Sequence, residues 1–388
     1  MLGGRKAATL IAGEILLVAI VLIWKRLDGL DLDVYRLGTQ AFFDHGDPYV
    51  VLPPTRDGTA LPFTYPPFAA IAFAPLLVVS LDTALIALTV ISVLALGAVL
   101  ALCFRHYDRR VFVVGAATLV VQAVALFSEP VRATLGFGQV NVLLMLLVVA
   151  DTLGPVKQRG YLVGLAAAVK LTPAAFILFF LVRKDFRSAA RAGATFAGCV
   201  AIAWAIAPDA SSHYWTKLVF QGERIGDPGY IGNQSLRGLI ARLGGGQLIW
   251  LLAAVVVLVL TAFAIHRARQ PVPALLVCAM GALLVSPVSW THHWVWAAPA
   301  IGVLAWQRRW WAAAPATIVL IVSPLWDHQD IWPLRESYVL VGAFLLVLLA
   351  RPSAFAWPAS TKALDHVLDA GRERRDVARL DRGEHADP

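Results

Sequence analysis

Long runs of apolar residues dominate the chain, and polar residues gather in the segments between them. Four runs approach the ~20 residues that a helix needs to cross ~30 Å of bilayer hydrocarbon. They are Ala7–Trp24, Leu85–Phe104, Ala189–Ala207 and Leu248–Ile265. Of the 388 residues, 59% are hydrophobic and only 15% are charged, which is far too apolar for a soluble domain of this length. The pattern predicts an all-α polytopic membrane protein in contact with the lipid bilayer.

Basic residues alternate between successive segments, as the positive-inside rule requires. With Arg5 and Lys6 placed inside, basic residues fill the predicted cytoplasmic segments, and most acidic residues fall in the others. About twelve crossings satisfy this alternation, with both termini in the cytoplasm. Because membrane topology accounts for the net charge of +8, we expect no nucleic-acid partner. We place the chain in the cytoplasmic (inner) membrane, with its chemistry on the extracytoplasmic side.

One predicted pair of crossings is interrupted. The segments 160–170 and 172–182 form a short hairpin broken at Lys170-Leu171-Thr172-Pro173, because proline lacks a backbone N–H. A membrane tolerates such a break only where protein or water satisfies the freed backbone groups. We expect residues 1–350 to form one transmembrane domain and residues 351–388 a charged cytoplasmic tail.

Two predicted outer segments are too long to be simple connections. The first long segment, residues 25–67, and the second long segment, residues 208–246, contain Trp, Tyr and Phe, which favours ordered structure. The apolar stretch Phe68–Val79 is too short to cross a bilayer and is typical of a helix along the membrane interface. Such helices commonly form a shelf near a lipid substrate.

Two carboxylates follow the first predicted crossing, at Asp31 and Asp33. A carboxylate at this membrane surface can serve as a general base beside a lipid headgroup. Acids that flank a crossing are also common as solvated residues or helix caps. Because the i, i+2 spacing puts the two on different faces of a helix, at most one of them points inward.

Further polar residues stand where apolar helices begin or break. Glu129 and Arg132 either bind substrate or pair with each other. Gln139 and Asn141 cost free energy in an apolar helix unless they are hydrogen-bonded, which favours a polar cavity. Lys170 either neutralises a phosphate or extends to the interface.

Two more polar clusters are candidates for substrate contact. Asn233 and Gln234 carry amides that can hydrogen-bond sugar hydroxyls. His292 and His293 stand between tryptophans, as in an interfacial aromatic belt, or they act near neutral pH on a sugar hydroxyl or a neighbouring carboxylate. We expect no metal site, since the histidine spacing matches none of the usual ligand patterns.

Nucleotide-binding and hydrolase signatures are absent from the sequence. It contains no Walker A loop, no GxSxG elbow and no GxGxxG after a strand. A nucleotide-sugar donor is therefore disfavoured, and a donor that resides in the membrane fits better.

Seven short motifs, in order between residues 31 and 295, together resemble glycosyltransferase family 87. They are Asp-Leu-x-Val-Tyr at 31–35, Gly46-Asp47-Pro48-Tyr49, Tyr65-Pro66-Pro67, Gly138-Gln139-Val140-Asn141, Lys170-Leu171-Thr172-Pro173, Asn233-Gln234-Ser235 and Ser289-Trp290-Thr291-His292-His293. The resemblance implies a GT-C fold, a bundle of membrane helices with the first long segment packed on top as an extracytoplasmic catalytic platform. It also implies transfer of mannose from polyprenyl-phosphate-mannose to a phosphatidylinositol mannoside or lipomannan-type glycolipid.

The resemblance also implies roles for individual residues. Asp31 matches the catalytic aspartate of the family, with Asp33 as a competitor, and His292 or His293 assists with the acceptor. Tyr35 and Tyr65 fall within the matched motifs and are expected to contact substrate. We expect no cofactor, because fixed cations beside a leaving phosphate make a metal ion unnecessary.

Two other functions fit parts of the pattern. One is a transferase that uses another prenyl-linked sugar, such as arabinofuranose, since these motifs do not select the sugar. The other is a lipid or sugar transporter with a broken helix at Lys170. A transporter should concentrate its polar residues near the membrane midplane, whereas these motifs cluster at the predicted outer boundary.

Overall fold

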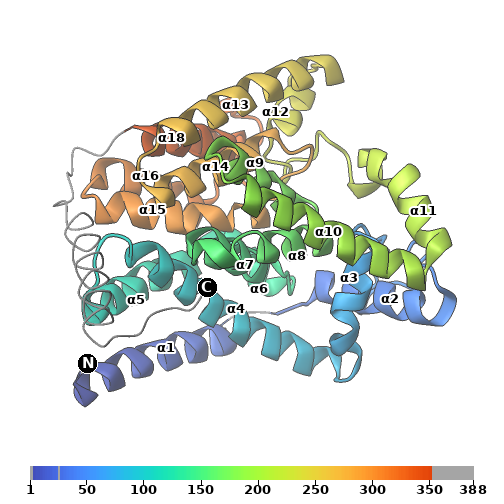
Figure 1. Cartoon of the computed structure of the whole chain (residues 1–388), viewed down its shortest axis with the longest axis horizontal. Helices are drawn as coiled ribbons and strands as arrows, with labels where there is room; N and C mark the ends of the chain where they lie inside the picture. The colour runs from blue at the N-terminus through green and yellow to red at the C-terminus, as the bar shows by residue number, and fades with distance from the viewer. Residues whose placement is uncertain (1–2, 25–26, 352–388) are drawn as a thin grey trace, which may run out of the picture. The chain divides into compact units, whose positions relative to one another are not determined.

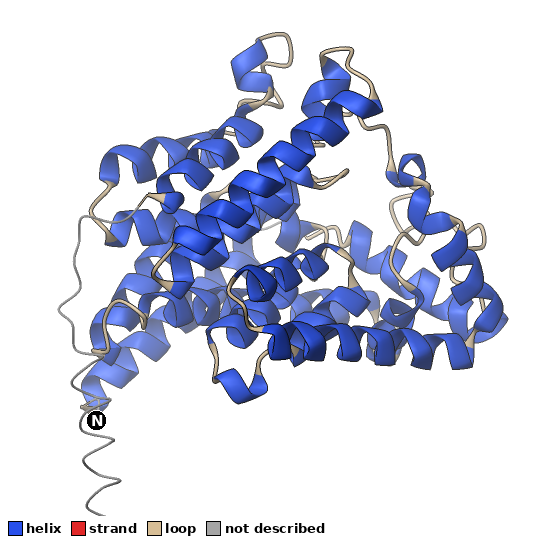
Figure 2. Cartoon of the chain, turned by 45° about the horizontal axis from the view of Figure 1, so that its top comes forward, coloured by secondary structure: helices blue, strands red, loops and turns tan. Residues whose placement is uncertain are grey.

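The structure is a computed structural model that describes residues 3–24 and 27–351. The predicted tail from residue 352 onward, and the first two residues of the first long segment, lie outside the described residues. Helices and loops make up the described part, without strands (Figure 2). A single isolated bridge joins Asn233 to Trp290. These observations confirm the all-α prediction.

Four helices are long and apolar enough to cross a membrane. They are α1 (Gly4–Trp24), α4 (Leu81–Phe104), α10 (Phe186–Ile206) and α13 (Gln247–Arg267). All four coincide with the runs identified in the sequence. A fifth span is possible if α5 (Val111–Phe127) and α6 (Glu129–Gly136), bent by 76° at their junction, count as one. The total of twelve crossings stays a prediction.

Shorter helices complete the bundle (Figure 1). They are α7 (Asn141–Leu153), η2 (Val156–Gln158), α14 (Pro271–Val285), η6 (Thr291–Trp296), α15 (Ala297–Trp306), α16 (Trp310–Val322), α17 (Trp332–Arg335) and α18 (Ser337–Ala350). Helix α14 packs against α13 and α18, and twelve of its fifteen residues are buried. By contrast, α13 leaves Leu252, Val255 and Val259 exposed, as expected for a surface in contact with lipid.

The predicted break at Lys170 is confirmed. Helix α8 (Tyr161–Val169) ends there, and Lys170 itself is extended, with φ −146° and ψ 129°. The chain resumes as η3 (Thr172–Phe176) and α9 (Ile177–Val182). Pro173 stands near the start of η3, where its missing N–H leaves no helical hydrogen bond unmade.

Both long segments contain helices. The first holds α2 (Leu30–His45), followed by α3 (Pro67–Phe73) and η1 (Ala74–Leu77), and the second holds α11 (Pro208–Thr216), η4 (Leu218–Phe220), η5 (Gly222–Ile225) and α12 (Leu236–Arg242). Figure 1 shows α2, α3 and α11 gathered at one end of the bundle. The rings of Tyr49 and Tyr214 stack at 5.4 Å, and Arg224 donates to the Phe63 carbonyl at 2.8 Å. The two long segments therefore pack as one layer.

Candidate active site

Asp31 lies in the first turn of α2, which is anchored directly on the end of α6. The backbone N–H groups of Asp31 and Leu32 donate to the Phe137 carbonyl at 3.0 and 3.1 Å. These bonds satisfy N–H groups that a helix start leaves without intrahelical partners. Gly138 allows the approach, since it has φ +67° and a Cβ there would stand 2.7 Å from Leu32 Cβ.

This anchoring distinguishes the two carboxylates of α2. Asp31 accepts a hydrogen bond from Gln139 Nε2 at 2.7 Å. Asp33 instead accepts from the Arg56 backbone N–H at 2.7 Å, in the first long segment. Asp31 therefore belongs to a polar cluster with Gln139, while Asp33 organises a neighbouring loop.

Gln139 connects Asp31 to two buried tyrosines. Its Oε1 accepts from the Tyr35 hydroxyl at 2.8 Å and from the Tyr65 hydroxyl at 3.3 Å, and the two hydroxyls are 2.8 Å apart. Because the tyrosines hold the amide oxygen, the amide nitrogen is directed at the carboxylate of Asp31. The arrangement fixes the orientation of that carboxylate.

The environment of Asp31 alters its proton affinity. Burial raises the pKa of the carboxyl to about 6, against the opposing effects of the Gln139 hydrogen bond and the Lys170 charge. A carboxylate with such a pKa is mostly ionised at neutral pH and holds a proton more readily than an ordinary aspartate. These are the properties of a general base.

Lys170 supplies a cation on the other side of the same cluster. Its Nζ donates to Asn141 Oδ1 at 2.9 Å, lies 3.1 Å from His293 Nε2, and is 5.3 Å from the centre of the Tyr65 ring. No carboxylate of the described residues is within ion-pair distance of Lys170. The ammonium is therefore held by neutral groups, and its charge is available to an anion.

The two histidines have different surroundings in η6. Burial and the Lys170 charge lower the pKa of His293, so the ring is neutral at neutral pH and its Nε2 accepts from Lys170. The His292 carbonyl accepts from Thr134 Oγ1 at 2.9 Å and from Asn141 Nδ2 at 3.1 Å. The buried Nε2 of His292 has no hydrogen-bond partner among the described residues.

Glu129 supports η6 by a side-chain hydrogen bond at its first residue, just before the histidines. Its carboxylate accepts from Thr291 Oγ1 at 2.8 Å and from the Tyr338 hydroxyl at 2.9 Å. Arg132 is exposed, and no ion pair joins it to Glu129 within the described part of the chain. The simple pairing of these two residues is therefore wrong, and the contacts of Glu129 make it a support for the histidine segment.

Asn233 and Gln234 are fully buried and bound to backbone groups. Asn233 Nδ2 donates to the carbonyls of Pro228 and Pro287, and its Oδ1 accepts from the Ser289 N–H. Gln234 Nε2 donates to the carbonyls of Ile231 and Arg335. Both N–H groups of each amide are used in this way, so a sugar hydroxyl cannot accept from them. We correct the expectation of sugar binding to a structural role, which joins the second long segment to residues 287–289.

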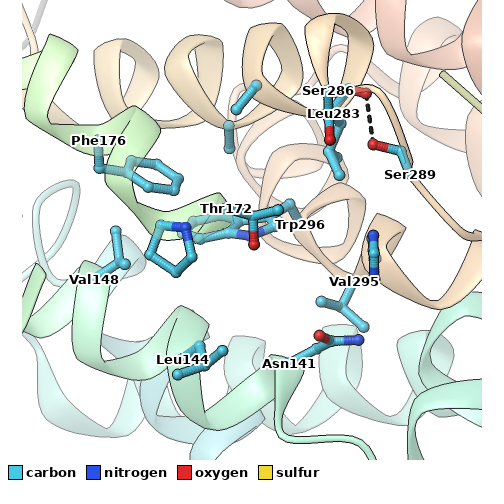
Figure 3. A pocket seen from close by; sticks show the side chains of 14 residues that line it. Asn141, Leu144, Val148, Thr172, Phe176, Leu283, Ser286, Ser289, Val295 and Trp296 are labelled. Atoms are coloured by element: carbon cyan, nitrogen blue, oxygen red, sulfur yellow. Dashed lines mark hydrogen bonds between the residues drawn. The ribbon is translucent and has the colours of Figure 1, made fainter. Parts of the chain in front are cut away.

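An apolar cavity of about 540 Å³, part of it open to solvent, begins beside Lys170. Asn141 and His293, both bonded to Lys170, line it, and Leu144, Val148 and Phe176 form its opposite end. Figure 3 shows those three apolar side chains at one end, and Asn141 with Ser286 and Ser289 at the other. A ligand there would have a polar group near the cluster and an apolar chain between the helices.

Segments that are distant in sequence thus meet at one site that contains a carboxylate, a cation and a neighbouring apolar cavity. The sequence profile of glycosyltransferase family 87 matches residues 63–287, more than half of the chain. The chain belongs to glycosyltransferase family 87. This membership confirms the resemblance and favours a transferase over a transporter.

Two groups of relatives support this family 87 assignment. A polyprenol-phosphate-mannose-dependent α-(1-2)-phosphatidylinositol mannoside mannosyltransferase of Mycolicibacterium smegmatis is 40% identical over 305 residues, covering 70% of this chain and 68% of the relative. A protein of the same name in Mycobacterium tuberculosis is 35% identical, over 80% and 79% of the two chains. A phosphatidylinositol pentamannoside mannosyltransferase of M. smegmatis is 32% identical, over 86% and 85%.

The match and the site overlap only in part. Residues 63–287 include Tyr65, Gln139 and Lys170, whereas Asp31 and His293 lie outside that range.

Sequence analysis missed Thr134 and Tyr338, which hold η6 through the His292 carbonyl and through Glu129. A buried threonine or tyrosine in an apolar helix carries no signal of its partner. Among the described residues, no three His, Cys, Asp or Glu side chains are grouped to hold a metal ion.

Proposed function

We propose that this family 87 enzyme transfers mannose from polyprenyl-phosphate-mannose to a phosphatidylinositol mannoside or lipomannan-type glycolipid, forming an α-1,2 bond. The observation that carries the proposal is the part-buried Asp31 carboxylate within the electrostatic reach of the Lys170 cation, whose partners Asn141 and His293 line an apolar cavity. The relatives, which are named as mannosyltransferases, support mannose over arabinofuranose as the donor sugar.

The proposed reaction is a single inverting displacement. Asp31 takes the proton of an acceptor hydroxyl, and that oxygen forms a bond to C1 of the donor mannose. The bond between C1 and the phosphate oxygen breaks, and its electron pair leaves with the polyprenyl phosphate. Gln139, held by Tyr35 and Tyr65, keeps the Asp31 carboxylate in position through the step.

Lys170 stabilises the leaving phosphate in this mechanism. A fixed cation placed where negative charge develops lowers the transition-state energy. Asn141 and His293 orient the ammonium, so His293 acts on the donor side. We propose that the Lys170 charge stabilises the leaving phosphate without a metal ion or other cofactor. His292 and the exposed Arg132 contact the acceptor in this proposal.

The apolar cavity next to Lys170 accommodates the prenyl chain in this proposal. Leu144, Val148 and Phe176 provide an apolar lining at the end of the cavity away from the residues bonded to Lys170. Burial of apolar isoprene units there supplies binding energy, while the cation orients the reacting bond.

We further propose a GT-C fold for residues 1–350, with about twelve crossings and the charged tail from 351 in the cytoplasm. Both termini are then cytoplasmic, and the layer formed by the two long segments is the extracytoplasmic catalytic platform. The distribution of basic and acidic residues between segments supports this orientation.

The decisive experiment measures transfer of radiolabelled mannose from polyprenyl-phosphate-mannose to a phosphatidylinositol mannoside, using purified full-length protein. Asp31→Asn should lose about 10²–10⁴-fold in kcat, because the amide cannot accept the proton. Asp33→Asn, two residues away on the other face of α2, is the matched control and should keep activity within a few-fold. Full activity of the Asp31 variant would refute the assignment of Asp31 as the general base. Transfer of arabinofuranose by wild type would show that the donor sugar is not mannose.

A further inference from the structure

A second cavity lies apart from the Asp31 cluster, between the second long segment and the stretch that joins α16 to α18. It holds about 830 Å³, part of it open solvent. Tyr230 and Arg242 line it from one side, and Trp326, Asp330 and Arg335 from the other. Its lining shares no residue with the apolar cavity beside Lys170.

Two exposed aromatic rings face this polar cavity. Tyr230 is 50% exposed and Trp326 is 36% exposed, with ring centres 6.4 Å apart and planes inclined by 54°. Exposed rings of this size are costly to leave in water. Two inclined rings present apolar faces of the size of a pyranose ring, whose C–H groups pack on aromatic surfaces.

The hydrogen-bonding groups around the rings suit a neutral polyol. Four of the five N–H groups of Arg242 are used: two bond to Glu336 and two donate to the carbonyls of Tyr230 and Asn233, which fixes its guanidinium in place. Arg335 lines the cavity and donates its Nε–H to Glu336, which leaves the other N–H groups of its partly exposed side chain able to donate. The exposed Asp330 and the Oε1 of Gln329 add acceptors to that donor. Alternating donors and acceptors match vicinal hydroxyl groups.

The cavity is connected to the catalytic segment through Trp290. The Trp290 ring contacts Tyr230 edge-on, with centres 5.7 Å apart, and Trp290 bridges to Asn233 through the backbone. Thr291, the next residue, is bound by Glu129, and the two histidines follow. A molecule that fills the cavity therefore packs on Tyr230, whose ring contacts the residue directly before η6.

The geometry points to a binding site for an acceptor sugar other than the one that receives mannose. The occupant is a neutral hexose of the acceptor glycan, packed on Tyr230 and Trp326 and hydrogen-bonded by Asp330 and Arg335. This inference rests on the proposed function and deepens it, since it assigns recognition of the glycan length to a site separate from the reacting groups.

The test compares two acceptors with purified full-length protein and polyprenyl-phosphate-mannose. One is a phosphatidylinositol mannoside with several mannoses, and the other is octyl α-mannoside, which has a single sugar. For the long acceptor, Tyr230→Ala should raise KM about 10-fold and leave kcat unchanged. For octyl α-mannoside, the same variant should leave both KM and kcat unchanged. Asp330→Asn should act in the same direction. The hydrogen bonds of this turn use the main chain of Tyr230, so the alanine variant retains them.

Trp332→Ala is the matched control, because Trp332 is 51% exposed in the same stretch but does not line the cavity. It should leave both acceptors unaffected. Equal kinetics of wild type and Tyr230→Ala with the long acceptor, or equal losses with both acceptors, would overturn the inference.

A binding measurement separates this inference from the proposed function. Saturation-transfer NMR with a soluble α-mannotetraose should show contact with wild type and lose it in Tyr230→Ala. A signal that is present in wild type and lost in Tyr230→Ala supports the site. This holds even if wild type fails to transfer mannose, a result that would refute only the proposed function. An equal signal in both proteins, or none in wild type, refutes the site.

Discussion

Asp31 and Lys170 are two ionisable side chains of opposite charge that lie in one part-buried cluster. Neither forms an ion pair among the described residues. Asp31 is held by an amide N–H, and Lys170 by an amide oxygen and a neutral imidazole. Because neutral groups fix both, the charges stay available; in the proposed mechanism one takes the acceptor proton and the other stabilises the leaving phosphate.

The raised pKa of Asp31 predicts the pH dependence of the reaction. Only the carboxylate form accepts a proton, and its fraction falls as the pH drops through its pKa of about 6. We therefore expect kcat/KM to decline about tenfold per pH unit below this value. The Gln139 hydrogen bond lowers that pKa, so Gln139→Leu should move the decline to higher pH.

Gln40→Leu is the control for that measurement, since Gln40 is exposed on the same helix. Its profile should match wild type. A wild-type decline near the ordinary aspartate value of about 4 would show that burial does not raise the pKa of Asp31 in the working enzyme.

At the scale of elements, the junction of α2 and α6 determines where Asp31 stands. The first turn of α2 donates to carbonyls at the end of α6, and Gly138 lets the two backbones approach. A side chain at Gly138 would meet Leu32 while the backbone stays left-handed, a conformation that costs roughly 1–2 kcal/mol for other residues. Helix α1 is attached differently, by a side-chain hydrogen bond in which Gln122 on α5 donates to Glu14 at 2.9 Å.

Gly138→Ala should therefore lower both stability and activity. We expect a loss of at least ~1 kcal/mol in the free energy of unfolding, seen as a lower Tm in detergent, together with reduced kcat. Gly246→Ala is the control, because Gly246 has φ −86° and no atom within 4 Å of an added Cβ. Equal Tm values for the two variants would contradict the strained junction.

At the scale of the whole molecule, the two long segments pack together, and the first of them supplies Asp31, Tyr35 and Tyr65 to the cluster. Tyr49 and Tyr214 stack across them, and Asn233 and Gln234 join the second segment to the histidine segment and to α17. The proposed topology puts this layer outside the cell and the segment between α7 and α8 inside. Each assignment can be tested by asking whether a reagent that cannot cross the membrane reaches an introduced cysteine.

Single cysteines should report this topology. Ala60→Cys lies in the first long segment and Gln158→Cys between α7 and α8, and both positions are exposed. A membrane-impermeant maleimide should label Ala60→Cys in intact cells and Gln158→Cys only after permeabilisation. The native cysteines Cys103, Cys199 and Cys278 are buried, so wild type should stay unlabelled. The reverse pattern would invert the proposed orientation.

The sequence by itself determined the four helices long and apolar enough to span a membrane and the break at Lys170, and it named most of the residues that meet in the Asp31 cluster. Apolar length and proline chemistry act locally, so they need no knowledge of neighbours. Only the tertiary structure gave Asp31 and Asp33 different partners and buried Asn233 and Gln234 against backbone groups. An amide that binds a sugar and one that binds a backbone carbonyl have the same local sequence, and their partners come from segments that only folding brings together.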